Sequence, residues 1–414
     1  MRKGLLLLLL IFAAFGSIKA QWTKCTLPAG VLAYSLAVNG ETLVLGTLSH
    51  GVYLSTDKGA SWKEINTGIT NKQVWSIAII DNNFFAGTAS GGLFRSTDNG
   101  SNWTAVNNGI ASTTIIRSIV KLNNKLFATS TNKGIYISAD NGANWTQHNN
   151  GIVGLVASPL LVAESELFTG VLQSVYRYDK ANEKWVAANS GIINNTISAL
   201  TYFKDKSGII NLFAGVSNSE SNVYRSVNSG TSWTGAFKGL ATVPVATLAT
   251  VGTTIFAGND YGVYMSKDNG DNWTDASTGF NLASYATFLS VGKQELYVIQ
   301  SGSVWKRNFA DFGITSAREI EQENQADSHL LQNYPNPFNR YSNISYRLSK
   351  GAQVSLVVYN LAGAAVKTIV NEYQPEGTYS YRVSIGYAQL PPGIYTYKLV
   401  SGSSVHAKKM IVVQ

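Results

Sequence analysis

The stretch Ser55-Thr-Asp57-Lys-Gly59-Ala-Ser-Trp62 is repeated along the chain with a fixed internal spacing. Four further copies keep the serine, the acidic or amide residue, the glycine and the tryptophan: Ser96, Asp98, Gly100 and Trp103; Ser138, Asp140, Gly142 and Trp145; Ser226, Asn228, Gly230 and Trp233; Ser266, Asp268, Gly270 and Trp273. A degenerate copy runs from Tyr176 through Asp179 to Trp185. The six tryptophans stand 41, 42, 40, 48 and 40 residues apart. A period near 40 residues with several short strands per unit predicts a β-propeller.

Each repeat has the same internal order of expected strands. In the second unit these strands cover residues 74–79, 84–88, 92–96 and 103–106, and the repeated stretch forms the last turn. The second strand of each unit gives the blade count, because it begins at seven positions: Leu43, Phe84, Leu126, Leu167, Leu212, Ile255 and Leu296. We therefore predict an all-β fold, a seven-bladed β-propeller over residues 21–312, followed by a small immunoglobulin-like β-sandwich.

The two ends of this region complement each other. The seventh unit has no copy of the repeated stretch and no fourth strand, whereas residues 21–24 read as a fourth strand with no unit before it. We expect the N-terminal strand to complete the last blade and close the ring. Closure removes the exposed sheet edges that would otherwise promote aggregation.

The repeated phrase resembles the Asp-box, also called the bacterial neuraminidase repeat, of sialidases, sortilin-type receptors and photosystem assembly factors. The resemblance implies a structural turn, in which the carboxylate caps backbone N–H groups, the glycine takes a positive φ and the indole packs between blades. Calcium binding is the alternative, but each copy offers a single carboxylate where calcium needs several oxygen ligands. No metal or other cofactor is expected.

The C-terminal part changes in composition. Residues 313–328 are polar and charged, as in a linker, and residues 329–414 alternate like the strands of a small sandwich. The motifs at 334–339, 359–363, 393–397 and 408–411 resemble the C-terminal sorting domain of the type 9 secretion system of Bacteroidetes. The resemblance implies an outer-membrane translocon as partner and a location outside the cell or on its surface. An adhesive immunoglobulin-like module is the alternative.

The N-terminus has the pattern of an export signal. Arg2 and Lys3 precede an apolar run that is too short for a typical membrane span, and small residues lead to Ala20. We predict a signal peptide at residues 1–20, cleavage before Gln21 and no transmembrane segment after cleavage; an uncleaved anchor is the alternative. Cys25 is the single cysteine, which excludes a disulfide framework and a cysteine-based zinc site.

The charge of the chain is spread thinly. The formal net charge is +8, yet residues 21–312 carry 20 Lys and Arg against 18 Asp and Glu. No run of basic residues stands out, so we expect no nucleic-acid partner.

Propeller ligands usually lie over the central channel, on the face opposite the repeated turns. On that face Glu220 and Asp260 form the one carboxylate pair that qualifies for glycoside hydrolysis, which needs two carboxylates across the scissile bond. Arg95, Arg177 and Arg225 fall on third strands, away from the axis, so they do not match the arginine triad of sialidases.

The residues that open the inner strands are better candidates for binding. They include Tyr34, Trp75, Arg117 and Tyr285, whereas the other blades offer Ala157, Ile197 and Val245. Aromatic rings and an arginine at a channel mouth can stack on a sugar or hold a peptide, although they can also simply pack on one another. Three classes of function remain open: a binding propeller with a glycan or protein ligand, an assembly or scaffold factor, and a hydrolase or lyase acting on polysaccharide.

Overall fold

The computed structural model describes residues 21–192, 196–205, 207–217, 222–280, 285–314, 328–330, 333, 336–348, 351–384, 390–402 and 404–413. The expected signal peptide and most of the expected linker lie outside these residues. The chain divides into two compact units, Met1–Ala317 and Arg318–Gln414. Each unit is described by itself.

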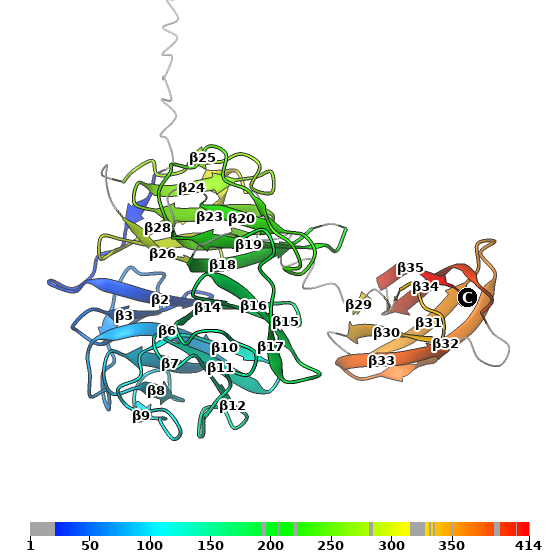
Figure 1. Ribbon diagram of the computed structural model, residues 1–414, viewed down its shortest axis with the longest axis horizontal. Coiled ribbons are helices and arrows are strands. Elements are labelled where there is room, and N and C mark those ends of the chain that lie inside the picture. Colours follow the sequence, from blue (N-terminus) through cyan, green and yellow to red (C-terminus); the bar gives the residue numbers. More distant parts are fainter. Residues whose placement is uncertain are drawn as a thin grey trace, which may run out of the picture. The chain divides into compact units, whose positions relative to one another are not determined.

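The first unit contains seven four-stranded antiparallel sheets, which confirms the predicted propeller and its blade count. In Figure 1 the strands of the second blade lie in order from β6 near the middle to β9 at the edge. The strands of the first three blades are β2 (Ala33–Asn39), β3 (Thr42–Thr47), β4 (Val52–Ser55) and β5 (Lys63–Glu64); β6 (Val74–Ile80), β7 (Asn83–Thr88), β8 (Leu93–Ser96) and β9 (Thr104–Ala105); β10 (Ile116–Leu122), β11 (Lys125–Ser130), β12 (Ile135–Ser138) and β13 (Thr146–Gln147).

The remaining blades follow the same order. Their strands are β14 (Ala157–Ala163), β15 (Glu166–Val171), β16 (Ser174–Asp179) and β17 (Lys184–Ala187); β18 (Ile197–Lys204), β19 (Ile210–Val216), β20 (Val223–Ser226) and β21 (Thr234–Gly235); β22 (Val245–Val251), β23 (Thr254–Asn259), β24 (Gly262–Ser266) and β25 (Thr274–Asp275); β26 (Ala286–Val291), β27 (Glu295–Gln300) and β28 (Ser303–Asn308). A short 3₁₀ helix, η1 (Phe309–Phe312), ends the unit.

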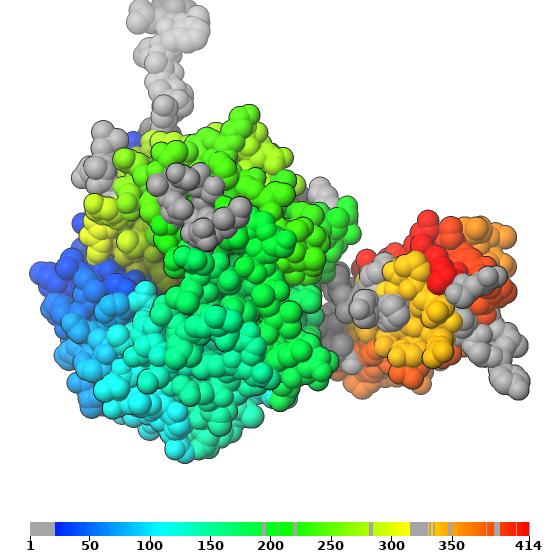
Figure 2. All heavy atoms as spheres, in the orientation of Figure 1, coloured from blue at the N-terminus to red at the C-terminus, as the bar shows by residue number. Residues whose placement is uncertain are grey.

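The N-terminal strand closes the ring, as the sequence predicts. Strand β1 (Thr23–Lys24) pairs antiparallel with β28 and becomes the fourth strand of the seventh blade. Trp22, just before it, is buried and its backbone N–H donates to the carbonyl oxygen of Thr278 on the sixth blade. In Figure 2 the blue atoms of the first blade lie beside the yellow atoms of the last one.

The hydrophobic core lies between adjacent blades rather than in one central mass. Between the first two blades, for example, Val44 and Val52 pack with Phe84, Ala86 and Trp103. The strands that supply these residues alternate little, because both faces of an inner or middle strand are covered by neighbouring blades. The second strand of each blade is therefore almost entirely buried.

The tryptophans of the repeat join successive blades by hydrogen bonds. The indole N–H of Trp103 donates to the carbonyl oxygen of Ile65, three residues after Trp62 on the preceding blade. The same three-residue offset holds for four further bonds: Trp185 to His148, Trp233 to Ala188, Trp273 to Ala236, and Trp22 to Ala276. Trp145 donates instead to Gly142 in its own turn. Trp22 thus takes the place of a repeat tryptophan in the blade that lacks one.

The second unit is a two-sheet arrangement, in agreement with the predicted sandwich. One sheet has the order β29 (Ser328–Leu330), β30 (Tyr341–Leu348), β33 (Gly377–Ser384); the other has the order β32 (Ala365–Gln374), β31 (Ala352–Tyr359), β34 (Gly393–Ser401), β35 (Ser404–Val412). A common core from both sheets includes Ile344, Tyr346, Leu356, Val383 and Leu399.

Within the described residues, no helix has the length and apolar character needed to cross a membrane.

Candidate functional site

Every inner strand of the propeller begins with a β-bulge at the same position. In the first blade Ala33 pairs with Thr47 and Ser35 with Gly46, so Tyr34 stands between the two pairs without a partner of its own. Trp75 and Arg117 occupy this position in the next two blades. The bulged residues of the other blades are Ser158 and Pro159, Ser198, Ala246 and Thr287. A bulge bends a strand and turns one side chain away from its regular direction.

These bulged residues line one central cavity of about 700 Å³. The cavity therefore brings together Tyr34, Trp75 and Arg117, three of the four binding residues predicted from the sequence. Tyr285, the fourth, also lines it and keeps 57% of its surface exposed. Tyr285 lies just before β26, two residues ahead of the bulged Thr287 of the same blade.

The structure corrects the expectation that the first residues of the other inner strands lie at the channel mouth. Ala157, Ile197 and Val245 do open their strands, but all three are buried and none lines the cavity. The bulge explains the difference, because the residue that turns toward the cavity is the one after the first paired residue. The sequence shows the strand but carries no clear signal for the bulge, and so the small polar residues Ser158 and Ser198 were missed.

Tyr34, Trp75 and Arg117 form a compact cluster on the cavity wall. The rings of Tyr34 and Trp75 have centroids 5.1 Å apart, at an interplanar angle of 55°. The Arg117 guanidinium donates to the Tyr34 hydroxyl at 3.1 Å, and its central carbon lies 5.1 Å from the Trp75 ring centroid. The arginine is thus held by a hydrogen bond from the first blade and a cation–π contact from the second.

Besides this cluster and Tyr285, the polar side chains that line the cavity are serines and threonines. Some of them are already used between blades: Ser76 donates to the carbonyl oxygen of Ile116 at 2.7 Å, and Ser198 donates to that of Val245. Thr247 accepts from the backbone N–H of Leu289 at 3.0 Å. These bonds fix the inner strands against one another and so keep the cavity wall in place.

The carboxylate pair considered for hydrolysis is not assembled in the described cavity wall. Asp260 is exposed and does not line the cavity, and Glu220 lies outside the described residues. Among the lining residues that the structure describes there is no Asp or Glu.

The three arginines on third strands also serve other contacts. Arg95 donates to the carbonyl oxygen of Asn141, Arg177 pairs with Glu166 at 3.4 Å, and Arg225 pairs with Asp271 at 3.0 Å. None of the three lines the cavity. They stabilise the outer parts of blades and their turns.

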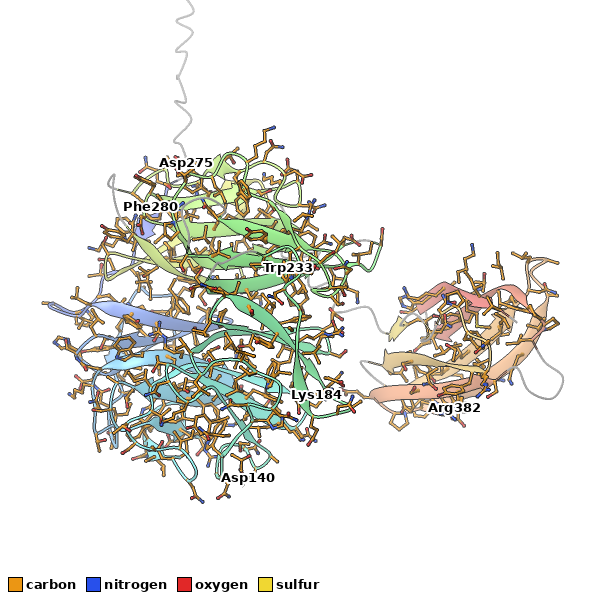
Figure 3. All side chains as sticks on the ribbon, viewed as in Figure 1. Asp140, Lys184, Trp233, Asp275, Phe280 and Arg382 are labelled. Carbon is orange, nitrogen blue, oxygen red and sulfur yellow. The ribbon has the colours of Figure 1, made fainter. Side chains whose placement is uncertain are left out.

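The repeated turns lie away from the cavity. In the second blade Ser96 donates to Asp98 at 2.8 Å and accepts from the backbone N–H of Gly100, while Asp98 accepts from the backbone N–H of Asn102. Figure 3 shows the equivalent Asp140 at the edge of the propeller, whereas Trp233 lies inside it. The same bonds recur around Asp57, Asp140, Asn228 and Asp268.

Hydrogen bonds to the turn carboxylates lower their pKa. For Asp98 the side-chain bond from Asn102 is the largest cause, followed by the backbone bond from the same residue, and the pKa falls from 3.8 to about 2. Asp140 has the same shift through Asn144. The described residues contain no group of three or more His, Cys, Asp or Glu that could hold a metal ion.

Two family models match parts of the sequence. A model described as a secretion system C-terminal sorting domain matches residues 332–413, and the DUF6242 beta propeller domain matches residues 31–150 and 84–207. None of the curated proteins compared with the sequence matches it. The chain is therefore a β-propeller followed by a secretion sorting domain.

Solved structures similar to the chain are propellers. YCF48 from Cyanidioschyzon merolae has a TM-score of 0.55 at 13% identity, over 70% of this chain and 99% of that one. PorZ, a surface component of the type-IX secretion system of Porphyromonas gingivalis, has a TM-score of 0.53 at 14% identity, over 94% of this chain and 60% of that one. The extracellular domain of BT4673 from B. thetaiotaomicron has a TM-score of 0.61 at 13% identity, over 94% of this chain and 52% of that one. At such identities the likeness shows the fold alone.

The sorting domain also determines where the protein goes. A C-terminal domain of this family directs its protein through a secretion system, which makes this chain a secreted or cell-surface protein that interacts with secretion machinery.

Proposed function

Because the chain carries a C-terminal secretion sorting domain, we propose that its propeller is an extracellular binding module that takes a saccharide into the central cavity. The observation that carries this proposal is the cluster of Tyr34, Trp75 and Arg117 on the cavity wall, which Tyr285 also lines. We assign the partner of the C-terminal domain to the type 9 translocon.

The size and chemistry of the cavity support a saccharide. Its volume of about 700 Å³ lies in the range of small-ligand sites. Aromatic rings can cover the apolar face of a sugar, and the serine and threonine hydroxyls of the wall can bond sugar hydroxyls. The wall combines both kinds of surface, the aromatic rings of Tyr34 and Trp75 and the hydroxyl groups of Ser158, Ser198 and Thr287.

The alternatives from the sequence have less support. A polysaccharide hydrolase would need two carboxylates at the bound sugar, and the described cavity wall includes none. A scaffold function does not require the combination of aromatic rings and hydroxyl groups that the cavity wall presents. The geometry therefore favours binding over cleavage or assembly.

The test is a glycan array and a polysaccharide pull-down with the purified full chain, with sugar release measured in parallel. We expect binding without release, and Trp75→Ala should weaken it about ten-fold or more, because one stacking face is lost. Binding followed by release of sugar would replace the proposal with a hydrolase.

Two exposed tyrosines provide a matched control. Tyr285 and Tyr261 are 57% and 59% exposed, but only Tyr285 lines the cavity. Tyr285→Ala should weaken binding and Tyr261→Ala should leave it unchanged. Absence of binding to any glycan would contradict the proposal and direct the search to a protein ligand.

A further inference from the structure

Arg117 gives the central cavity a single charge. It is the one ionised side chain among the described residues that line the cavity, and it is half-buried. No Asp or Glu of the described chain lies within salt-bridge distance of it. The other described Arg and Lys residues of the propeller stand outside the cavity wall.

The contacts of Arg117 leave much of its bonding capacity unused. A guanidinium carries five N–H donors in a planar fork, and the hydrogen bond that the structure shows uses one of them, to Tyr34 at 3.1 Å. The contact with Trp75 is to the ring face and consumes no donor. The side chain is thus fixed in position on two sides while other donors are available to a ligand in the cavity.

A fixed guanidinium with spare donors is suited to a planar anion. Carboxylates accept two parallel N–H bonds from arginine, and charge-assisted bonds of this kind are roughly twice as strong as neutral ones. The described cavity wall holds no carboxylate that would compete, so we expect the pairing partner to come from the ligand. Partial burial also reduces the screening that weakens surface pairs.

We propose that the cavity selects an acidic saccharide, in which a ring carboxylate pairs with Arg117 while the sugar ring covers Trp75. This inference rests on the proposed saccharide function and goes beyond it by naming the ligand class as uronic acids. Tyr34 acts as a positioning residue, since its hydroxyl holds the guanidinium at the wall.

The test compares each acidic sugar with the same sugar after its carboxylate has been neutralised. The probes are trigalacturonate and a hyaluronan tetrasaccharide, each beside its methyl ester, with a sulfated and a neutral oligosaccharide as further arms. Calorimetry with the full chain should show that at least one acid form binds about ten-fold or more tightly than its ester. The preference should shrink as salt is raised, because the pairing is electrostatic.

Variants of Arg117 link the preference to this residue. Arg117→Gln should abolish the difference between acid and ester, because the acid form loses its pairing partner. Arg117→Lys should retain part of the difference, because it keeps the charge but loses the planar fork. Residual affinity for the ester shows that the aromatic wall has survived the substitution, and unchanged thermal midpoints show that the fold has survived.

The outcomes separate this inference from the proposal beneath it. Equal binding of acid and ester, or a preference that survives in Arg117→Gln, overturns the carboxylate assignment but leaves a saccharide-binding module. A preference for the sulfated sugar also overturns the assignment. Lack of binding by every probe and every glycan of the array contradicts both.

Discussion

The side chain at the third position of the repeated turn is Asp in four of the five full copies and Asn in one. In the first copy Asp57 accepts from the hydroxyl and the backbone N–H of Ser61. In the fifth blade Asn228 makes the corresponding backbone contact, since it accepts from the N–H of Ser232 at 2.9 Å, and its amide donates to the Ser232 hydroxyl. A serine hydroxyl can both donate and accept, so the position tolerates a carboxylate or an amide.

The ionisation of Asp57 makes the stability of the first repeated turn depend on pH. The bonds from the Ser61 side chain and backbone hold the pKa of Asp57 well below its ordinary value of 3.8. A carboxyl group with a lowered pKa stabilises the fold above its unfolded-state value, and this stabilisation is lost as the pH falls through the folded-state value. Acid should therefore weaken this turn only below about pH 4.

We predict that Asp57→Asn lowers the sensitivity of the protein to acid. The variant recreates the Asn228 and Ser232 pair, so the fold should be kept at pH 7, but the group no longer titrates. The midpoint of urea denaturation, measured at pH 7 and at pH 3, should fall less in the variant than in the parent. Asp260→Asn, which changes an exposed carboxylate outside the turns, is the control and should behave like the parent. Equal acid sensitivity of Asp57→Asn and the parent would refute the link.

The degenerate fourth copy shows how one substitution changes a turn. Tyr178 follows Arg177 as Ser96 follows Arg95, so it stands where the other copies have serine. Its ring centroid lies 5.1 Å from those of Phe127 and Trp185. Its hydroxyl is buried without a hydrogen-bond partner in the described part of the chain, and burial raises the pKa of Tyr178.

Two substitutions at Tyr178 should therefore have opposite results. Tyr178→Phe removes an unpaired buried hydroxyl and keeps the ring, so the free energy of unfolding should stay equal or rise. Tyr178→Ser restores the usual residue of the turn but empties the space between Phe127 and Trp185, which should cost about 3–5 kcal/mol. Equilibrium unfolding in guanidinium chloride measures both changes. A stable Tyr178→Ser protein would show that the serine matters more than the packing.

At the scale of strands, the sequence allowed the blade order to be predicted but not the direction of the inner side chains. The seven starts of the second strands give the blade count, and the incomplete units at both ends predict the closure of the ring. The bulges at Tyr34, Trp75 and Arg117 depend on the pairing register between first and second strands, which composition does not reveal. Three of the four predicted binding residues are aromatic, and this feature indicated a binding site in the sequence. Ser158 and Ser198 are small and polar, as in many turns, and so did not indicate one.

Closure of the ring depends on one short strand and the residue before it. Trp22 is 3% exposed, stacks on Phe280 at 4.9 Å and contacts Phe312 at 5.8 Å. Its indole N–H donates to the carbonyl oxygen of Ala276 at 2.8 Å. Trp62, by contrast, is only half-buried, and its indole nitrogen has no hydrogen-bond partner among the described residues.

We predict that Trp22→Ala destabilises the propeller more than Trp62→Ala. The first substitution removes a fully buried ring, its stacking and a hydrogen bond between blades, for a cost of about 3–5 kcal/mol. The second removes a partly exposed ring with no bond to lose. Chemical denaturation of the two variants, followed by circular dichroism, gives the comparison. An equal loss of unfolding free energy in both variants would mean that Trp22 does not hold the ring closed.

At the scale of the whole molecule, the hydrogen bonds that join adjacent blades also hold the wall of the central cavity in place. Indole bonds fix the outer parts of adjacent blades, and hydroxyl bonds such as that of Ser76 fix the inner strands. The cavity is bounded by residues from all seven blades, and its cluster of Tyr34, Trp75 and Arg117 comes from inner strands. A sorting domain that brings such a propeller to the cell surface or beyond gives it access to external saccharides.

The claim that the ligand occupies the central cavity is tested most directly by filling that space. Ala246 lines the cavity from the sixth blade, has an exposed side chain and lies outside the Tyr34, Trp75 and Arg117 cluster. The measurement is the dissociation constant of the best saccharide for Ala246→Trp, beside Ala246→Ser as a variant that adds little volume. We predict that Ala246→Trp weakens binding about ten-fold or more while Ala246→Ser binds like the parent. Unchanged affinity in a folded Ala246→Trp protein would place the ligand elsewhere and contradict the account.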